Sequence, residues 1–131
     1  MLMKLGNQKG FTLLELLIVM SIIGVLAMVA VPRFTGAVAL ANTSKIQSDL
    51  NVLNSAIVLY EAEHGSYPKN LTTDMKDYIQ DAEKLKPPKG KCLLRDGTTV
   101  EITETGYTLS EDKSQALCQS HTITDFGRKD K

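Results

Sequence analysis

Hydrophobic residues are distributed unevenly along the chain, and the first third holds an almost uninterrupted apolar run. From Phe11 to Val31 there are 21 residues and a single charge, that of Glu15. At about 1.5 Å per residue, a helix of this length extends about 31 Å, enough to cross the hydrocarbon core of a bilayer. The pattern therefore predicts a transmembrane helix over residues 11–31.

After this run the pattern becomes that of an amphipathic helix over residues 35–64. Pro32 is expected to kink the helix or open it locally, and Gly65 to end it. Apolar residues recur every three or four positions and form one stripe: Ile46, Leu50, Leu53, Ile57 and Tyr60. Residues 11–64 thus predict one long helix, with its first half in lipid and its second half packed on a globular head.

Beyond residue 65 the apolar stretches are short and are separated by turn signals. A short helix is predicted over residues 73–83, and strands over 92–95, 98–103, 107–109 and 119–124. The Asp96-Gly97 pair favours a hairpin turn between the first two strands. We therefore expect an α+β fold, in which the long N-terminal helix packs on an antiparallel sheet of three or four strands in a head of residues 65–131.

The residues just before the apolar run carry a more specific signal. Residues 1–10 contain two lysines and no acid and end in Gly10, which Phe11 follows; Glu15 is the fifth residue counted from Phe11. Together with Pro32, this combination resembles the N-terminus of type IV pilins and pseudopilins over about the first 32 residues. An ordinary secretory signal peptide fits less well, because its apolar region is about 7–15 residues long and carries no internal charge.

The resemblance implies how the chain is processed and assembled. A prepilin peptidase would cut after Gly10, release the leader of residues 1–10 and methylate the new terminal residue, Phe11. Glu15 would pair with the amino terminus of a neighbouring copy in a helical filament, and the segment around Pro32 would loosen as the subunit leaves the membrane. A membrane platform and a polymerising ATPase would drive assembly.

Physical chemistry supports a paired role for Glu15. Cleavage after Gly10 would create an α-amino group on Phe11 that is mostly cationic at neutral pH. In lipid neither charge is stable alone, so an ion pair between copies would favour packing and fix the axial register. A carboxylate that extends to the nearer membrane face is the alternative that charge position alone leaves open.

The charges around the apolar run also set its orientation. Basic residues precede it, which places the leader in the cytoplasm and the rest of the chain outside, where a disulfide persists. Cys92 and Cys118 both lie in this exported part, and we expect them to pair. Closing such a loop contributes about 3 kcal/mol. Two unpaired buried thiols are the alternative.

Composition argues against several classes of site. Fifteen basic and fifteen acidic residues balance, which is unlike a general electrostatic nucleic-acid binder. His64 and His121 have no cysteine or acid at ligand spacing, so we predict no metal, cofactor or catalytic site. Four acids of the C-terminal region lack the compact alternation of a calcium loop: Glu111, Asp112, Asp125 and Asp130.

We therefore predict a structural subunit of a type IV pilus-like filament for adhesion or motility, and not an enzyme. It would cross the bacterial cytoplasmic membrane once before assembly and stand on the cell surface afterwards. The alternatives are a major pseudopilin of a type II secretion system and a competence pilus subunit for DNA uptake. DNA uptake would use a basic stretch around two prolines, which otherwise is a solvated loop: Lys84, Lys86, Lys89, Lys91 and Arg95.

Overall fold

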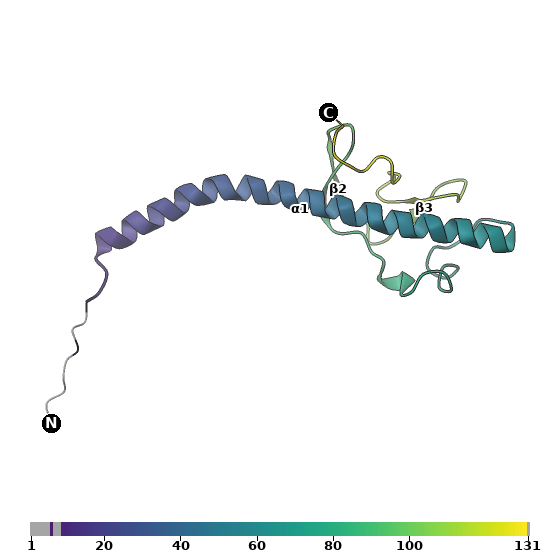
Figure 1. The fold of residues 1–131 in the computed structure, drawn as a ribbon, viewed down its shortest axis with the longest axis horizontal. Helices are drawn as coiled ribbons and strands as arrows, with labels where there is room; N and C mark the ends of the chain where they lie inside the picture. The colour runs from purple at the N-terminus through teal and green to yellow at the C-terminus, as the bar shows by residue number, and fades with distance from the viewer. Residues whose placement is uncertain (1–5, 7–8, 131) are drawn as a thin grey trace, which may run out of the picture. The chain divides into compact units, whose positions relative to one another are not determined.

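The computed structural model describes residue 6 and residues 9–130, and the main elements appear in Figure 1. A 52-residue helix is followed by a single 3-10 turn and four short strands. The fold is α+β, a long N-terminal helix packed on small antiparallel sheets, which confirms the predicted class. The elements are α1 (Leu13–His64), η1 (Ala82–Lys84), β1 (Gly90–Leu93), β2 (Thr99–Ile102), β3 (Thr108–Leu109) and β4 (Ala116–Leu117).

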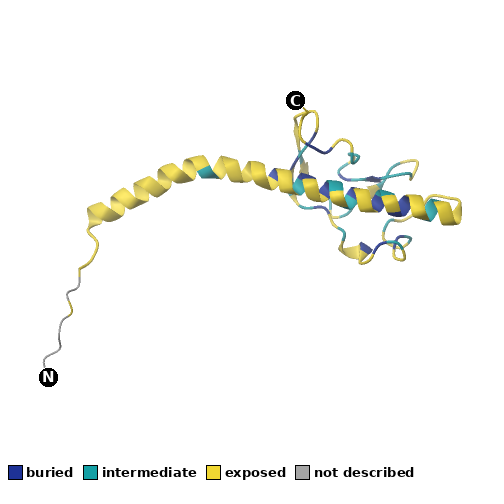
Figure 2. Cartoon of the chain, in the orientation of Figure 1, coloured by how far each residue is buried: buried dark blue, intermediate teal, exposed yellow. Residues whose placement is uncertain are grey.

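The chain forms two units, residues 1–35 and 36–131. In the first unit every described residue from 9 to 29 is exposed, as Figure 2 shows in yellow. The most apolar window of α1 has a mean hydropathy of 2.7, none of it is buried, and the helix is long enough to cross a membrane. The α-helix continues through Pro32, so the predicted local opening is not observed.

In the second unit α1 turns one face toward the head. The predicted stripe is confirmed: Ile46, Leu50, Leu53 and Ile57 are buried, and Tyr60 packs partly buried beside them. They form one hydrophobic cluster with side chains from the rest of the head. These are chiefly Met75, Ile79, Cys92, Leu94, Ile102, Ala116, Cys118 and Phe126.

The first two strands form the predicted hairpin. β1 and β2 are antiparallel, with Cys92 opposite Val100. Gly97 has a φ of +92°, a conformation that glycine adopts without strain, and its N–H donates to the Leu94 carbonyl (3.0 Å). The Asp96 carboxylate accepts from the Thr98 N–H (2.7 Å), which stabilises the turn.

The prediction of one larger sheet was wrong. The head has two separate two-stranded sheets, β1–β2 and β3–β4. The predicted strand over residues 119–124 is replaced by turns, because Gln119 and Ser120 have positive φ values (+48° and +64°) that end strand geometry. The last pairing strand is instead β4, at residues 116–117.

The helix predicted over residues 73–83 was also wrong, and only the 3-10 turn η1 forms at its end. Side chains at its start bind the backbone instead. Asp74 accepts from the N–H groups of Lys69 (2.8 Å) and Asn70 (3.0 Å), and Asn70 accepts from that of Thr72 (2.9 Å). A helix this short has little stability of its own, so these local bonds favour turns.

The C-terminal segment closes the core. Phe126 is completely buried, and its carbonyl accepts hydrogen bonds from Gln47 on α1 (2.8 Å) and from Arg95 (3.2 Å). The N–H of Gly127 donates to the Leu93 carbonyl of β1 (3.1 Å). The last residues of the head are therefore bound both to α1 and to the β1–β2 hairpin.

Replacing Phe126 tests this closure. Phe126→Ala is expected to lower the free energy of unfolding by about 3–5 kcal/mol, because it leaves a cavity in the core. Val58→Ala is the control, since Val58 is 60% exposed on α1 and its loss should cost less than about 0.5 kcal/mol. Urea unfolding of the full chain in detergent, followed by near-UV circular dichroism of its tyrosines, measures both. Equal midpoints for the parent and Phe126→Ala would contradict the burial.

Candidate assembly site

The start of α1 is closed by a reciprocal pair of hydrogen bonds. The Glu15 N–H donates to the Thr12 hydroxyl (3.2 Å), and the Thr12 N–H donates to the Glu15 carboxylate (3.3 Å). This is the capping box that threonine forms with a glutamate three residues later. It fixes the beginning of the helix at Leu13 and turns the Glu15 carboxylate back toward its own amino-terminal end.

The helix N-terminus stabilises the Glu15 carboxylate, but no described cation neutralises it. A negative charge in the first turn interacts well with the partial positive charge of the helix N-terminus. Among the described residues no basic group forms an ion pair with this carboxylate. A carboxylate accepts about four hydrogen bonds. Glu15 therefore caps its own helix and can still accept a cation.

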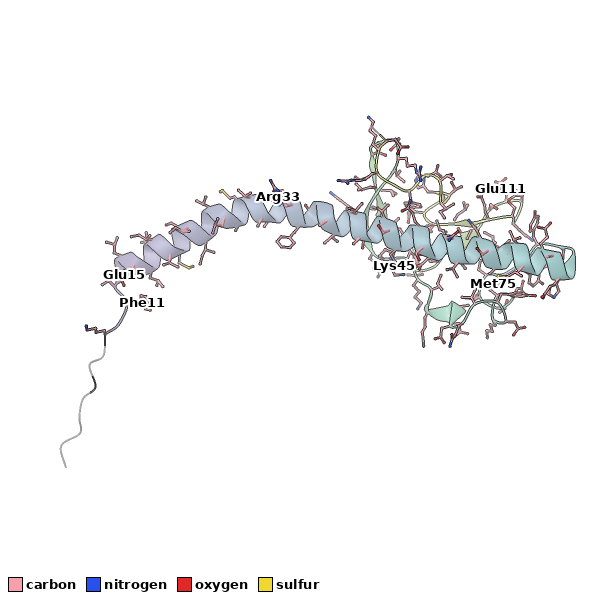
Figure 3. All side chains as sticks on the ribbon, in the orientation of Figure 1. Phe11, Glu15, Arg33, Lys45, Met75 and Glu111 are labelled. Atoms are coloured by element: carbon pink, nitrogen blue, oxygen red, sulfur yellow. The ribbon has the colours of Figure 1, made fainter. Side chains whose placement is uncertain are left out.

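The bond between Gly10 and Phe11 precedes α1 in a segment without regular structure. Both residues are exposed, and Phe11 is 90% exposed. Figure 3 shows Phe11 next to Glu15 at the start of the helix. Most of the predicted leader lies outside the described residues, but the bond at which cleavage is predicted is accessible.

In the head, polar contacts bind the second half of α1 to the strands. Asp49 accepts from the Lys45 ammonium (2.5 Å) and from the Tyr107 hydroxyl (2.6 Å). Burial and the Asp49 carboxylate raise the pKa of Tyr107, so the phenol remains protonated and donates. Asn54 accepts from the Ala116 N–H of β4 (2.8 Å). The pattern of apolar positions does not indicate these contacts.

The two cysteines belong to the same core. Cys92 lies on β1 and Cys118 directly follows β4, and both are completely buried. Both are free thiols, so the predicted disulfide is not formed in this structure. Burial, with smaller effects of Glu104 and of Cys92, raises the pKa of Cys118 to about 12. The pairing stays a prediction.

Comparison with known proteins identifies the N-terminal segment. Residues 5–31 match the family described as the prokaryotic N-terminal methylation motif. A type II secretion system core protein G of Klebsiella michiganensis is 34% identical over 95 residues, which are 72% of this chain and 65% of the relative. A ComG operon protein 3 homolog of Bacillus licheniformis is 31% identical over 88 residues, 66% of this chain and 89% of the relative. This chain belongs to the type IV pilin and pseudopilin family.

Other relatives divide among the branches of this family. A type IV major pilin of Neisseria gonorrhoeae is 35% identical over 104 residues, 72% of this chain and 63% of the relative. The chain spans between 44% and 65% of the length of the first three curated relatives that it matches. No solved structure matches it significantly. The comparisons thus assign the pilin family, but not one role within it.

Pilin family members are structural and non-enzymatic, which confirms the prediction that this chain is not an enzyme.

The two histidines contact other side chains of the head. The His64 ring stacks on Tyr60 (ring centroids 4.1 Å apart), and His121 Nδ1 lies 3.9 Å from Asp125 Oδ2. Two of the four acids that were considered for calcium bind nearby groups of the chain. Asp112 accepts from Ser110 (2.5 Å), and Asp125 accepts from the N–H of Thr122 (2.8 Å).

The cysteine pair provides a direct test. We expect chain recovered from outside the cytoplasm to carry a Cys92–Cys118 disulfide, because the two thiols share one core and an oxidising compartment favours pairing. Unfolding in iodoacetamide without reductant, followed by mass spectrometry, should then add no label. Cys92→Ser is the control, since it leaves Cys118 without a partner and should take one label. Two labels on the parent chain would contradict the pairing.

Proposed function

We propose that this chain is the structural subunit of a type IV pilus-like filament that serves adhesion or motility. The observation that carries the proposal is the uncovered apolar surface of α1 from Leu13 to Val29. A soluble protein rarely leaves so large an apolar surface in water. Lipid covers this surface before assembly, and the helices of other copies cover it in the filament.

Processing precedes assembly in this proposal. A prepilin peptidase removes residues 1–10 by cutting after Gly10, and Phe11 becomes the methylated amino terminus. The exposed bond and the match to the methylation motif over residues 5–31 support this step. The chain is then a single-pass protein of the cytoplasmic membrane, with its head outside, until it is extruded into the pilus.

Glu15 has two roles in the proposed assembly. In the free subunit it caps α1 through the Thr12 N–H. In the filament it also binds the amino group on Phe11 of a neighbouring copy, which neutralises two charges in an apolar surrounding. Pro32 lacks an N–H and is the position where α1 can loosen as the subunit leaves the membrane. A membrane platform and an ATPase supply the work.

The second candidate is a major pseudopilin of a type II secretion system. It is favoured by the relative named core protein G, which matches 72% of this chain. A competence pilus subunit is a third role, in view of the ComG operon relative. The three roles differ in where the processed chain accumulates and in what it binds.

The location of the processed chain tests the proposal. We expect mass spectrometry of material sheared from cells to find abundant chain beginning at N-methylated Phe11. The same processed chain found only in membranes would favour the pseudopilin. A chain that retains Met1 in both fractions would contradict the proposed processing.

Two substitutions of Glu15 separate its roles. Glu15→Ala removes the carboxylate that accepts from the Thr12 N–H, and with it the charge, so the yield of sheared filament should fall on the order of tenfold or more, since the neighbour's ammonium loses its partner. Glu15→Gln keeps an amide oxygen that can accept from the Thr12 N–H, but has no charge. If charge pairing drives assembly, both variants fail. Normal filaments from Glu15→Gln would assign the effect to capping and overturn the ion pair.

A further inference from the structure

Three exposed lysines lie close together in the chain, just before β1 and at its start. We name Lys86, Lys89 and Lys91 the lysine ridge. The Lys45 ammonium donates to the Lys86 carbonyl (3.1 Å), and the Asn42 amide donates to the Lys91 carbonyl (3.2 Å). The ridge is therefore held against α1 near residues 42–45.

The backbone of the lysine ridge is restricted, and its ammonium groups form no ion pair with the described residues. Two prolines separate its first two lysines, and Pro87 is buried, which restricts the backbone. Among the described residues none of the three ammonium groups forms an ion pair, whereas Lys84 pairs with Asp81 (3.2 Å). Glu101 lies opposite Lys91 in the hairpin but makes no such contact with it.

The opposite end of the same unit is acidic. Tyr107 binds α1 at Asp49, and farther along the chain Ala116 binds it at Asn54, so the β3–β4 hairpin extends toward the C-terminal end of α1. Its turn carries Glu111 and Asp112, and Figure 3 places Glu111 farther along α1 than Lys45.

A further carboxylate joins them. Glu61, on the last turns of α1, has the largest effect among the groups that raise the pKa of Tyr67, and Asp112 contributes to the same shift. We name Glu61, Glu111 and Asp112 the acidic end. Among the described residues none of its carboxylates forms an ion pair, although Lys113 lies in the same turn.

The positions at which the two surfaces meet α1 are far apart along the helix. Lys45 and Glu61 are 16 positions apart on α1, which is about 24 Å along a helix. Exposed charges at that separation are largely screened at physiological salt, where the Debye length is about 8 Å. Each head therefore has a basic surface and an acidic surface displaced along the axis of α1.

We propose that the lysine ridge of one copy binds the acidic end of the head of a second copy. The inference rests on the proposed filament function. In such an assembly all copies have the same orientation, so this contact joins two different surfaces and repeats without closing, as a fibre requires. A nucleic acid is a weaker match, since the chain as a whole is not basic while every copy carries the complementary acids.

Zero-length cross-linking of sheared filaments of the parent chain is the first test. A carbodiimide joins amines to carboxylates that are in contact. We expect links from the lysine ridge to the acidic end in covalent dimers of the chain, because a dimer held by such a link joins two copies. The link between Lys45 and Asp49, whose Nζ and Oδ2 atoms are 2.5 Å apart, is the internal control for the reaction. Filaments that show the Lys45–Asp49 link without any ridge link would overturn the inference.

Charge reversal is the second test, read as the ratio of sheared filament to processed membrane chain. The variant K86E/K89E/K91E should lower this ratio at least about tenfold, a change of about 1.4 kcal/mol. Adding E61K/E111K/D112K to it should restore filaments. Lys69→Glu with Lys129→Glu is the control, since both lysines are exposed and belong to neither surface, and it should retain them. If a charge-reversed variant does not accumulate in the cell, the cross-links of the parent chain alone test the head contact.

The outcomes separate this inference from the proposed function. If the parent chain is never found in sheared fibres, the filament proposal itself is contradicted. If the parent chain forms filaments and K86E/K89E/K91E forms as many, only the head contact is overturned. The same holds if adding E61K/E111K/D112K does not restore the filaments lost in K86E/K89E/K91E. Intact filaments that lose binding to a labelled DNA duplex would instead make the ridge a nucleic-acid surface.

Discussion

The apolar surface that the first half of α1 leaves uncovered is the constraint on which the rest of this structure depends. Residues 13–29 are all exposed, so their apolar side chains require lipid or other helices to cover them. The second half of the same helix is, by contrast, covered on one face by its own head. The two halves of one continuous helix therefore differ in what can cover their apolar side chains.

The head is small, and polar contacts supplement its limited hydrophobic core. Asp49 and Asn54 on α1 bind Tyr107 and β4, and the C-terminal segment places Phe126 in the core. These contacts bind sequence-distant segments to one helix face, which restrains the short sheets that would be marginal alone. The same contacts set the positions of the surface charges of the head along α1.

The strongly periodic features could be predicted from the sequence, and the locally determined ones could not. The apolar run, the Ile46–Ile57 stripe and the Asp96-Gly97 turn depend on spacing, which the chain displays directly. The two separate sheets, the turns after Asn70 and the positive φ values at residues 119–120 depend on individual side chain–backbone contacts. The Thr12–Glu15 cap corresponds to a Thr-x-x-Glu motif in the sequence, but a charge within an apolar run points first to an ion pair or to the membrane face.

The complete burial of Cys92 and Cys118 restricts when these two thiols can react. An oxidant or an oxidoreductase can contact these sulfur atoms only while the head is open. The redox state of the pair is therefore decided during folding and is protected from the medium afterwards. In the proposed filament, the timing of export relative to folding would therefore decide whether the mature head carries a disulfide or two thiols, more than the redox potential around it.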